Sequence, residues 1–303
     1  MTQKIIIITG PTATGKTDLA VRFALDMGGE VVNCDSMQVY KGMDIGTAKP
    51  RIEEKRGIPH HLLDIVDPDE EFNASRYREY ALPVIRDIGK RNRVCFVVGG
   101  TGLYIKSLLG GLFECPPSDI RIREQLIGEY NRLGKEALYE RLKKLDPESA
   151  RAIHPNDRVR ITRALEVMEL TGRPFSILAS DHSFKAREFS SIKICLYHDR
   201  EILYERINRR CIKMFESGLV EETEKLLRKG YSPDLKPLKS IGYRHAVDYL
   251  YKQRSYNESI ELLQRDTRRY AKRQITWFKA DPEMMWFSPD ESGDIVKRIE
   301  DFI

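Results

Sequence analysis

Long apolar runs are missing from this chain of 303 residues. Every apolar stretch is far shorter than the roughly 18 residues that a membrane-spanning helix needs, so we expect no membrane span. Only Met1-Thr2-Gln3 precede the first apolar stretch, so we expect no signal or transit peptide. Repeats and low-complexity segments are also absent. A hydrophobic fraction of 41% beside 32% charged residues is typical of a globular protein.

Cysteine is scarce, with only five residues in the chain. They stand at positions 34, 95, 115, 195 and 211, and no two show the C-x-x-C spacing of a zinc knuckle. An odd number of widely separated cysteines also argues against a disulfide framework. We therefore expect a reducing compartment, most simply the cytoplasm.

One segment is a complete phosphate-binding loop of the form G-x-x-x-x-G-K-[ST]. It follows a β-branched run at 4–9 and precedes helical spacing over 18–25, a context that disfavours an ordinary glycine-rich turn. Its backbone N–H groups and the helix N-terminus would hold a di- or triphosphate. The lysine would meet the distal phosphate, and the last hydroxyl would hold Mg²⁺. The loop consists of Gly10, Pro11, Thr12, Ala13, Thr14, Gly15, Lys16 and Thr17.

The apolar pattern predicts an α/β protein. Continuous apolar stretches predict strands at 4–9, 30–35, 93–98 and 191–197, with a last one at 284–287, and helical patterns such as 73–90 lie between them. This alternation is typical of a P-loop NTPase-like parallel sheet flanked by helices. We place this core domain at residues 1–115 and 189–303.

A different pattern fills residues 116–188. Four helices and no strand are predicted there, over 118–133, 135–145, 147–153 and 157–170. An all-helical insertion between two core strands indicates a separate lobe that could close over a substrate.

Positive charge gathers near the C-terminus, although the net charge of +5 is uninformative by itself. A capping box at Ser255 and Glu258 starts a helix there. One side of that helix would carry Arg265, Arg268, Arg269, Lys272, Arg273 and Lys279 against the single acid Asp266. The other side would carry Ile260, Leu263, Tyr270 and Trp277 and could face the core. The basic side is either a solvated surface or a track for a polyanion.

The usual apparatus for nucleotide hydrolysis is missing. Ligands bind at the carboxyl ends of strands in such sheets, where an NTPase would place an aspartate for Mg²⁺. The strand at 93–98 ends instead in Gly99-Gly100-Thr101-Gly102, and no Asn-Lys-x-Asp run occurs. The strand at 30–35 does end in a carboxylate, Asp35, which is a candidate catalytic group, a helix N-cap or a group beside Mg²⁺.

Eight motifs in one order resemble the tRNA dimethylallyltransferases, also called tRNA isopentenyltransferases. Each motif is weak alone, but the ordered set is specific and spans about residues 4 to 287. The zinc finger of eukaryotic members is absent, which indicates the bacterial type. One departure is Cys34, where a smaller residue such as alanine is expected. The motifs are the phosphate loop, 35–38, 42–50, 58–64, 99–104, 160–166, 241–244 and 272–278.

The resemblance implies transfer of a dimethylallyl group from dimethylallyl diphosphate to N6 of the adenosine 3′ of the anticodon, in tRNAs reading codons that begin with U. Asp35 would be the base and Thr101 would hydrogen-bond the same amine. Lys16 and Arg210 would face the diphosphate, with Arg209 as a rival to Arg210. Mg²⁺ at Thr17 would complete the site.

The target base must leave its stacked loop to reach Asp35. Residues that match tRNA-contacting positions of the family are Asp35, Ser36, Met37, Gln38, Thr101, Arg123, Val159, Arg160, Ile161, Thr162, Arg163, Ser240, Ile241, Gly242, Tyr243, Arg244 and His245. Arg123 could equally be ordinary surface charge. His60 and His61 are adjacent, so their side chains point apart, and we interpret them as structural or RNA-facing rather than metal-binding.

The expected partners are thus dimethylallyl diphosphate and the anticodon stem-loop of tRNA, with a monomeric enzyme. A P-loop small-molecule kinase is the main alternative. It would use the loop for ATP and Asp35 for an acceptor hydroxyl, but it leaves the basic helix without a purpose. An RNA-binding module without catalysis would leave the intact loop unexplained.

Overall fold

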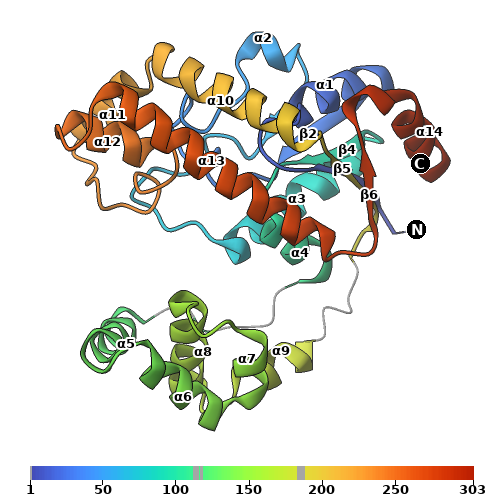
Figure 1. The fold of residues 1–303 in the computed structure, drawn as a ribbon. Helices are drawn as coiled ribbons and strands as arrows, with labels where there is room; N and C mark the ends of the chain where they lie inside the picture. The colour runs from blue at the N-terminus through green and yellow to red at the C-terminus, as the bar shows by residue number, and fades with distance from the viewer. Residues whose placement is uncertain (1, 112–115, 117–118, 183–187) are drawn as a thin grey trace. The chain divides into compact units, whose positions relative to one another are not determined.

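The computed structural model describes residues 2–111, 116, 119–182 and 188–303. The chain divides into two compact units, one formed by Met1–Leu109 with Glu188–Ile303 and the other by Gly110–Arg187 (Figure 1). The second unit corresponds to the helical insertion predicted for 116–188. Cys115, Pro117 and Ser118, at the expected boundary, lie outside the described residues.

A six-stranded parallel sheet forms the centre of the first unit, which confirms the α/β prediction. The strand order is β3-β2-β4-β1-β5-β6. The two-residue strand β3 was not predicted, because so short a segment shows no periodicity. The strands are β1 (Lys4–Thr9), β2 (Gly29–Asn33), β3 (His60–His61), β4 (Val94–Val98), β5 (Ser190–Leu196) and β6 (Met284–Phe287).

Helices surround the sheet. The predicted capping box begins α13, where Ser255 accepts a hydrogen bond from the backbone N–H of Glu258. Asn73 caps α3 by accepting from two backbone N–H groups. The helices of this unit are α1 (Lys16–Met27), α2 (Ile52–Lys55), α3 (Ala74–Lys90), α4 (Gly102–Gly110), α10 (Arg200–Glu216), α11 (Leu219–Arg228), α12 (Tyr243–Leu250), α13 (Tyr256–Lys279), the 3₁₀ turn η1 (Pro289–Glu291) and α14 (Ser292–Phe302).

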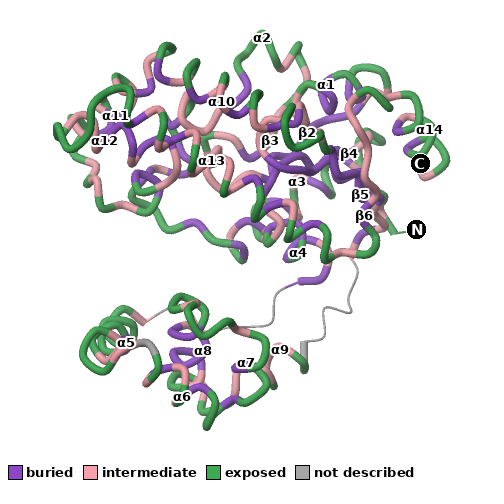
Figure 2. The backbone as a smooth tube through the Cα atoms, viewed as in Figure 1, coloured by how far each residue is buried: buried purple, intermediate pink, exposed green. Residues whose placement is uncertain are grey.

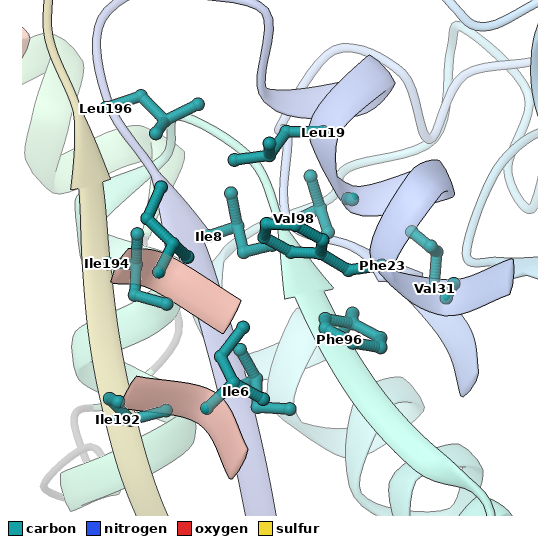
Figure 3. Close-up of a cluster of buried hydrophobic side chains, with 14 residues drawn as sticks. Ile6, Ile8, Leu19, Phe23, Val31, Phe96, Val98, Ile192, Ile194 and Leu196 are labelled. Carbon is teal, nitrogen blue, oxygen red and sulfur yellow. The ribbon is translucent and has the colours of Figure 1, made fainter. Parts of the chain in front are cut away.

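The central strands are buried on both faces, as Figure 2 shows in purple. On one face, Leu19 and Phe23 of α1 pack against Ile6 and Ile8 of β1 and their neighbours Phe96 and Ile194 (Figure 3). Each such side chain contributes about 1.5–3 kcal/mol when fully buried. Because the strands and α1 share this core, the loop that joins β1 to α1 has a rigid base.

The second unit has its own apolar core, which includes Leu126, Leu142 and Leu165. Its helices are α5 (Ile120–Leu133), α6 (Lys135–Leu145), α7 (Pro147–Ala152), α8 (Arg158–Thr171) and α9 (Phe175–His182). The first four match the predicted helices closely, but α9 was not predicted. Its start depends on a residue distant in sequence, because the buried carboxylate of Asp146 accepts hydrogen bonds from the Ser176 backbone N–H at 2.9 Å and hydroxyl at 2.6 Å.

Candidate active site

The phosphate loop has the conformation that its glycines allow. Gly10 has φ 140°, and a Cβ there would lie 2.4 Å from the carbonyl oxygen of Leu196. Gly15 has φ 87° and precedes α1 without a side-chain cap. The first N–H groups of α1 are therefore left for a ligand, and the positive end of the helix favours an anion.

Lys16 lies partly buried at the start of α1, where its Nζ donates a hydrogen bond to the carbonyl oxygen of Pro11 at 2.7 Å. Burial and, to a smaller extent, the nearby Arg210 guanidinium lower the pKa of this ammonium to about 8, although Asp35 partly opposes both effects. Lys16 and Arg210 thus bring two cations to one place. A bound diphosphate would relieve their repulsion.

The structure favours Arg210 over Arg209 as the arginine beside the diphosphate. Both arginines line the cavity described below, but Arg209 is exposed on α10 and pairs with Glu205 at 2.8 Å. Arg210 is half-buried, burial lowers its pKa, and it forms no ion pair within the described part of the chain. A residue that the sequence analysis missed is Arg206, whose Nε donates to the carbonyl oxygen of Ala13 at 2.8 Å. It lies one helical turn before Arg210, which was the only available signal.

Asp35 follows β2 and lies at the end of the sheet that carries the loop. Its Oδ1 accepts hydrogen bonds from the backbone N–H groups of Met37 at 2.8 Å and Gln38 at 3.4 Å. This carboxylate therefore caps a turn, not a helix as one alternative had it. Its second oxygen makes no hydrogen bond with the described residues, so it remains available to accept a proton.

Thr101 joins the ends of β2 and β4. Its hydroxyl accepts a hydrogen bond from the Ser36 backbone N–H at 3.0 Å, and its own N–H donates to the Cys34 carbonyl at 3.2 Å. Cys34 is buried, and burial raises its thiol pKa to about 12, so the departure from the family pattern adds no reactive group. Thr101 does not line the cavity described below, so its contact with the amine stays a prediction.

A cavity of about 870 Å³ brings these groups together within the first unit. Its walls come from the phosphate loop, the turn after β2, the helices α10 and α13, and the segment before α12. Among the predicted site residues that line it are Lys16, Thr17, Asp35, Ser36, Met37, Gln38, Arg210, Ser240, Ile241 and Arg244.

Two predicted tRNA contacts in the segment 240–245 need correction. The side chain of Tyr243 is fully buried, and its hydroxyl donates to Glu222 at 2.5 Å. His245 is buried as well, with Nε2 3.3 Å from Asp266. Both side chains hold α12 in place. Gly242, a third predicted contact, is buried too, and its backbone N–H donates to Nδ1 of His245 at 3.3 Å. Ser240, Ile241 and Arg244 are the predicted contacts of this segment that are not buried and line the cavity described above.

In the helical unit, too, some of the predicted tRNA contacts are exposed and others are buried. Val159 and Arg160 are exposed, whereas Ile161 and Thr162 face the core of the unit and cannot contact RNA as predicted. Arg123 and Arg163 both bind the fully buried carboxylate of Glu166, at 3.3 and 2.8 Å. Arg123 is therefore more than ordinary surface charge, because it neutralises a buried acid.

The basic side of α13 is narrower than predicted. Arg268 is partly buried, donates to Asn208 of α10 at 2.5 Å and lies over the Tyr204 ring. Asp266 also reduces the positive charge of this side. Burial alone would raise the pKa of Asp266, but hydrogen bonds from Arg265 and Arg244 outweigh the effect of burial and hold this pKa well below its usual value. The exposed cations are Arg265, Arg269, Lys272, Arg273 and Lys279.

The apolar side of α13 is also only partly as predicted. Leu263 is buried, and Ile260 and Tyr270 are half-buried. Trp277 is 40% exposed, and its ring lies over Gly102 at the start of α4 and not inside the core.

The described residues contain no group of three or more His, Cys, Asp or Glu that could hold a metal ion. His60 and His61 have structural partners, since His60 Nδ1 lies 2.8 Å from the Ile58 carbonyl and His61 Nε2 lies 2.8 Å from Glu30. Thr17 lines the cavity beside the loop, which suits Mg²⁺ that takes most of its ligands from phosphate oxygens and water. Among the described helices, none is both long and apolar enough to cross a membrane.

Comparison with known proteins identifies relatives along almost the whole chain. The IPP transferase family model matches residues 38–281, and the isopentenyl transferase model matches residues 3–67. tRNA dimethylallyltransferase 2 of Geotalea uraniireducens is 51% identical, covering 95% of this chain and 93% of its own. The tRNA dimethylallyltransferase of Geobacter sulfurreducens is 50% identical, covering 98% of this chain and 95% of its own.

Solved structures agree with these relatives. A full-length tRNA isopentenylpyrophosphate transferase from Bacillus halodurans has a TM-score of 0.73 at 40% identity, covering 99% of this chain and 96% of its own. A eukaryotic dimethylallyltransferase acting on tRNA has a TM-score of 0.76 at 29% identity, covering 95% of this chain and 75% of its own. These names support the transferase prediction and not the kinase alternative. The chain therefore belongs to the family of tRNA dimethylallyltransferases, a family of prenyl-transferring enzymes.

Proposed function

We propose that this protein transfers a dimethylallyl group from dimethylallyl diphosphate to N6 of the adenosine 3′ of the anticodon, in tRNAs that read codons beginning with U. The observation that carries the proposal is the single cavity shared by the phosphate loop, Arg210 and the open carboxylate of Asp35. One end of the cavity carries cations, and the other carries a carboxylate that can accept a proton. This arrangement suits a reaction in which an anion leaves while a proton is removed.

At the cationic end, the carbon–oxygen bond of the allylic diphosphate would break and negative charge would grow on the leaving group. Lys16, Arg210 and the loop N–H groups face that charge and stabilise it in the transition state. Mg²⁺ held by Thr17 would neutralise part of the same charge when it is bound. The loop here stabilises a departing diphosphate, which explains why no apparatus for attack on phosphorus is needed.

At the end of the cavity that carries Asp35, the exocyclic amine would form the new carbon–nitrogen bond. The lone pair of an adenine amine is delocalised into the ring, so the amine is a poor nucleophile, but its proton becomes acidic once the bond begins to form. The open oxygen of Asp35 takes that proton, and the Thr101 hydroxyl orients the amine. The diphosphate leaves with the electron pair of the broken carbon–oxygen bond as the carbon–nitrogen bond forms, and the amine proton passes to Asp35.

The base must be turned out of the anticodon loop to enter the cavity. Ser36, Met37 and Gln38 would form its pocket, and Gln38 is held rigidly because its amide donates to the carbonyls of Thr47 and Ala48, both at 3.2 Å. We further propose that the helical unit contacts the tRNA through exposed residues such as Val159 and Arg160. The enzyme would act as a monomer in the cytoplasm, which fits the four free cysteines among the described residues.

A labelling experiment tests the reaction. The protein is incubated with bulk tRNA and either dimethylallyl diphosphate labelled in the prenyl group or ATP labelled in the terminal phosphate. We expect prenyl label in the tRNA and no transfer of the ATP phosphate. Phosphate transfer without prenyl transfer would refute the proposal and restore the kinase alternative.

The exposed cations of α13 should bind RNA phosphates. Changing Arg269 and Lys272 together to Gln should weaken tRNA binding and lower the slope of log K against log[salt] by roughly 1–2 units, because fewer counterions are released. Filter binding at several salt concentrations measures this slope. Arg273 is unsuitable for this test because it also lines the cavity.

The matched control is the pair Lys297→Gln and Arg298→Gln, which removes the same charge from exposed positions of α14. The control should leave the salt slope and the affinity unchanged. Equal slopes for the α13 variant and the parent would mean that this side of α13 is only solvated surface.

Binding of dimethylallyl diphosphate should depend on the charge of Lys16. In the free protein its ammonium loses a proton near pH 8, whereas a bound anion favours the charged form. We therefore expect proton uptake on binding above about pH 8, and affinity that falls as the pH rises through that value. Calorimetry in buffers of different ionisation enthalpy measures the uptake. The Lys16→Met variant should lack this uptake, and equal uptake in both proteins would contradict the assignment.

A further inference from the structure

Gln274 is a buried polar residue to which the chemistry above gives no role. It lies on α13, and only 6% of its surface is exposed. Its Oε1 accepts a hydrogen bond from the backbone N–H of Thr12 at 2.9 Å, and its Nε2 donates to the carbonyl of Gly100 at 2.9 Å. One side chain from the C-terminal helix thus ties the phosphate loop to the end of β4.

The backbone is shaped to receive this amide. A Cβ on Gly100 would lie 2.3 Å from Nε2 of Gln274, so a glycine is needed where the amide lies. The next residue is Thr101, whose hydroxyl accepts from the Ser36 N–H beside Asp35. The amide therefore stands between the loop that holds the diphosphate and the segment that holds the acceptor base.

The carboxamide satisfies both partners at once. The Thr12 N–H needs an acceptor and the Gly100 carbonyl needs a donor, and both would be left unpaired in a largely buried place if the amide were lost. The same bond turns the Thr12 N–H towards α13, so Gln274 helps to decide which loop N–H groups face the cavity. Gln274 and its neighbour Arg273 both line that cavity, and the hydrogen bond from Thr12 to Gln274 connects α13 to the loop.

We propose that Gln274 is a positioning residue for the reaction. It holds Thr12 of the phosphate loop at a fixed position relative to the end of β4. Lys16 can then act on the leaving diphosphate while the carboxylate of Asp35 acts on the attacking amine. The effect on catalysis rests on the proposed function, whereas the effect on diphosphate binding does not.

The test replaces Gln274 by Met, which has a similar shape but neither hydrogen bond. The control is Gln264→Met on the same helix, where the amide donates to the Asn208 carbonyl of α10 at 3.3 Å and touches no part of the loop. Binding of inorganic pyrophosphate with Mg²⁺ is measured by calorimetry, beside thermal unfolding, tRNA affinity and transfer kinetics.

We expect Gln274→Met to bind pyrophosphate about 10-fold more weakly and to lower kcat by about 10- to 100-fold, with tRNA affinity within about 3-fold of the parent. Gln264→Met should keep both parent values. Gly100→Ala, which displaces the amide but keeps Gln274, should weaken pyrophosphate binding in the same way. In the double variant with Gln274→Met the two losses should not add, because the same bridge is already broken.

Parent-like pyrophosphate binding and kcat in Gln274→Met would overturn the inference. An equal loss in Gln264→Met would also overturn it, because the effect would then reflect general packing of α13. Should Gln274→Met fail to fold, Gly100→Ala decides the matter by the same binding measurement. If Gln274→Met binds pyrophosphate more weakly and the parent itself transfers no prenyl group, the inference is supported and the proposed function is refuted.

Discussion

Replacing Asp35 by Asn is expected to lower kcat by a factor on the order of 10²–10⁴, with tRNA affinity within a few-fold of the parent. The side-chain oxygen of Asn can still accept from the Met37 N–H, so the turn after β2 should keep its shape. What is lost is the open oxygen that takes the amine proton. Single-turnover kinetics beside filter binding separate the two effects.

A control for this variant is Asp67→Asn. Asp67 is an exposed carboxylate that pairs with Lys41 at 3.1 Å and does not line the cavity. Its loss should leave kcat unchanged. A collapse of tRNA affinity with normal kcat in Asp35→Asn would show that Asp35 recognises the RNA and is not the base.

Lys16→Ala is expected to lower kcat/KM for dimethylallyl diphosphate by a factor on the order of 10²–10³, the usual effect of removing one group that stabilises transition-state charge. It should also weaken diphosphate binding, because the ammonium fixed at the loop is lost. Steady-state kinetics with saturating Mg²⁺ and calorimetry with the diphosphate measure both effects.

The control for Lys16 is Arg22→Ala, which removes one positive charge from an exposed position of the same helix. It should behave as the parent in both measurements. A normal kcat/KM in Lys16→Ala would contradict the role of Lys16 in stabilising the leaving diphosphate, since no other residue of the loop has a charged side chain.

Part of this protein could be predicted from sequence because the determinants are local. The β-branched run, the glycines at 10 and 15, and the lysine after them specify strand, loop and helix within a few turns of chain. Asp35 and Thr101 could be placed beside the loop because parallel strands bring their carboxyl ends to one edge. The capping box of α13 was readable for the same reason, since both partners lie within four residues.

Other features depend on neighbours that are distant in sequence. The amphipathic pattern of α13 placed Arg268 on the solvent side, but Asn208 and Tyr204 of α10 hold it partly buried. Motif matching offered Tyr243 and His245 as RNA contacts, yet Glu222 and Asp266 hold both side chains inside the fold. A short strand such as β3 forms only because β2 lies ready to pair with it.

By itself, the sequence determined the phosphate loop, the parallel sheet, the helical insertion and the family, because each is written in local periodicity or in an ordered set of motifs. The tertiary structure alone decided that Arg210 and not Arg209 faces Lys16, that Arg273 enters the cavity, and that Gln274 bridges Thr12 and Gly100. The physical reason is that the burial of a side chain and its hydrogen-bond partners depend on which two elements pack against each other. The pattern of a single helix shows which side is apolar, but only the packing shows which polar atoms of the neighbouring element that side chain meets.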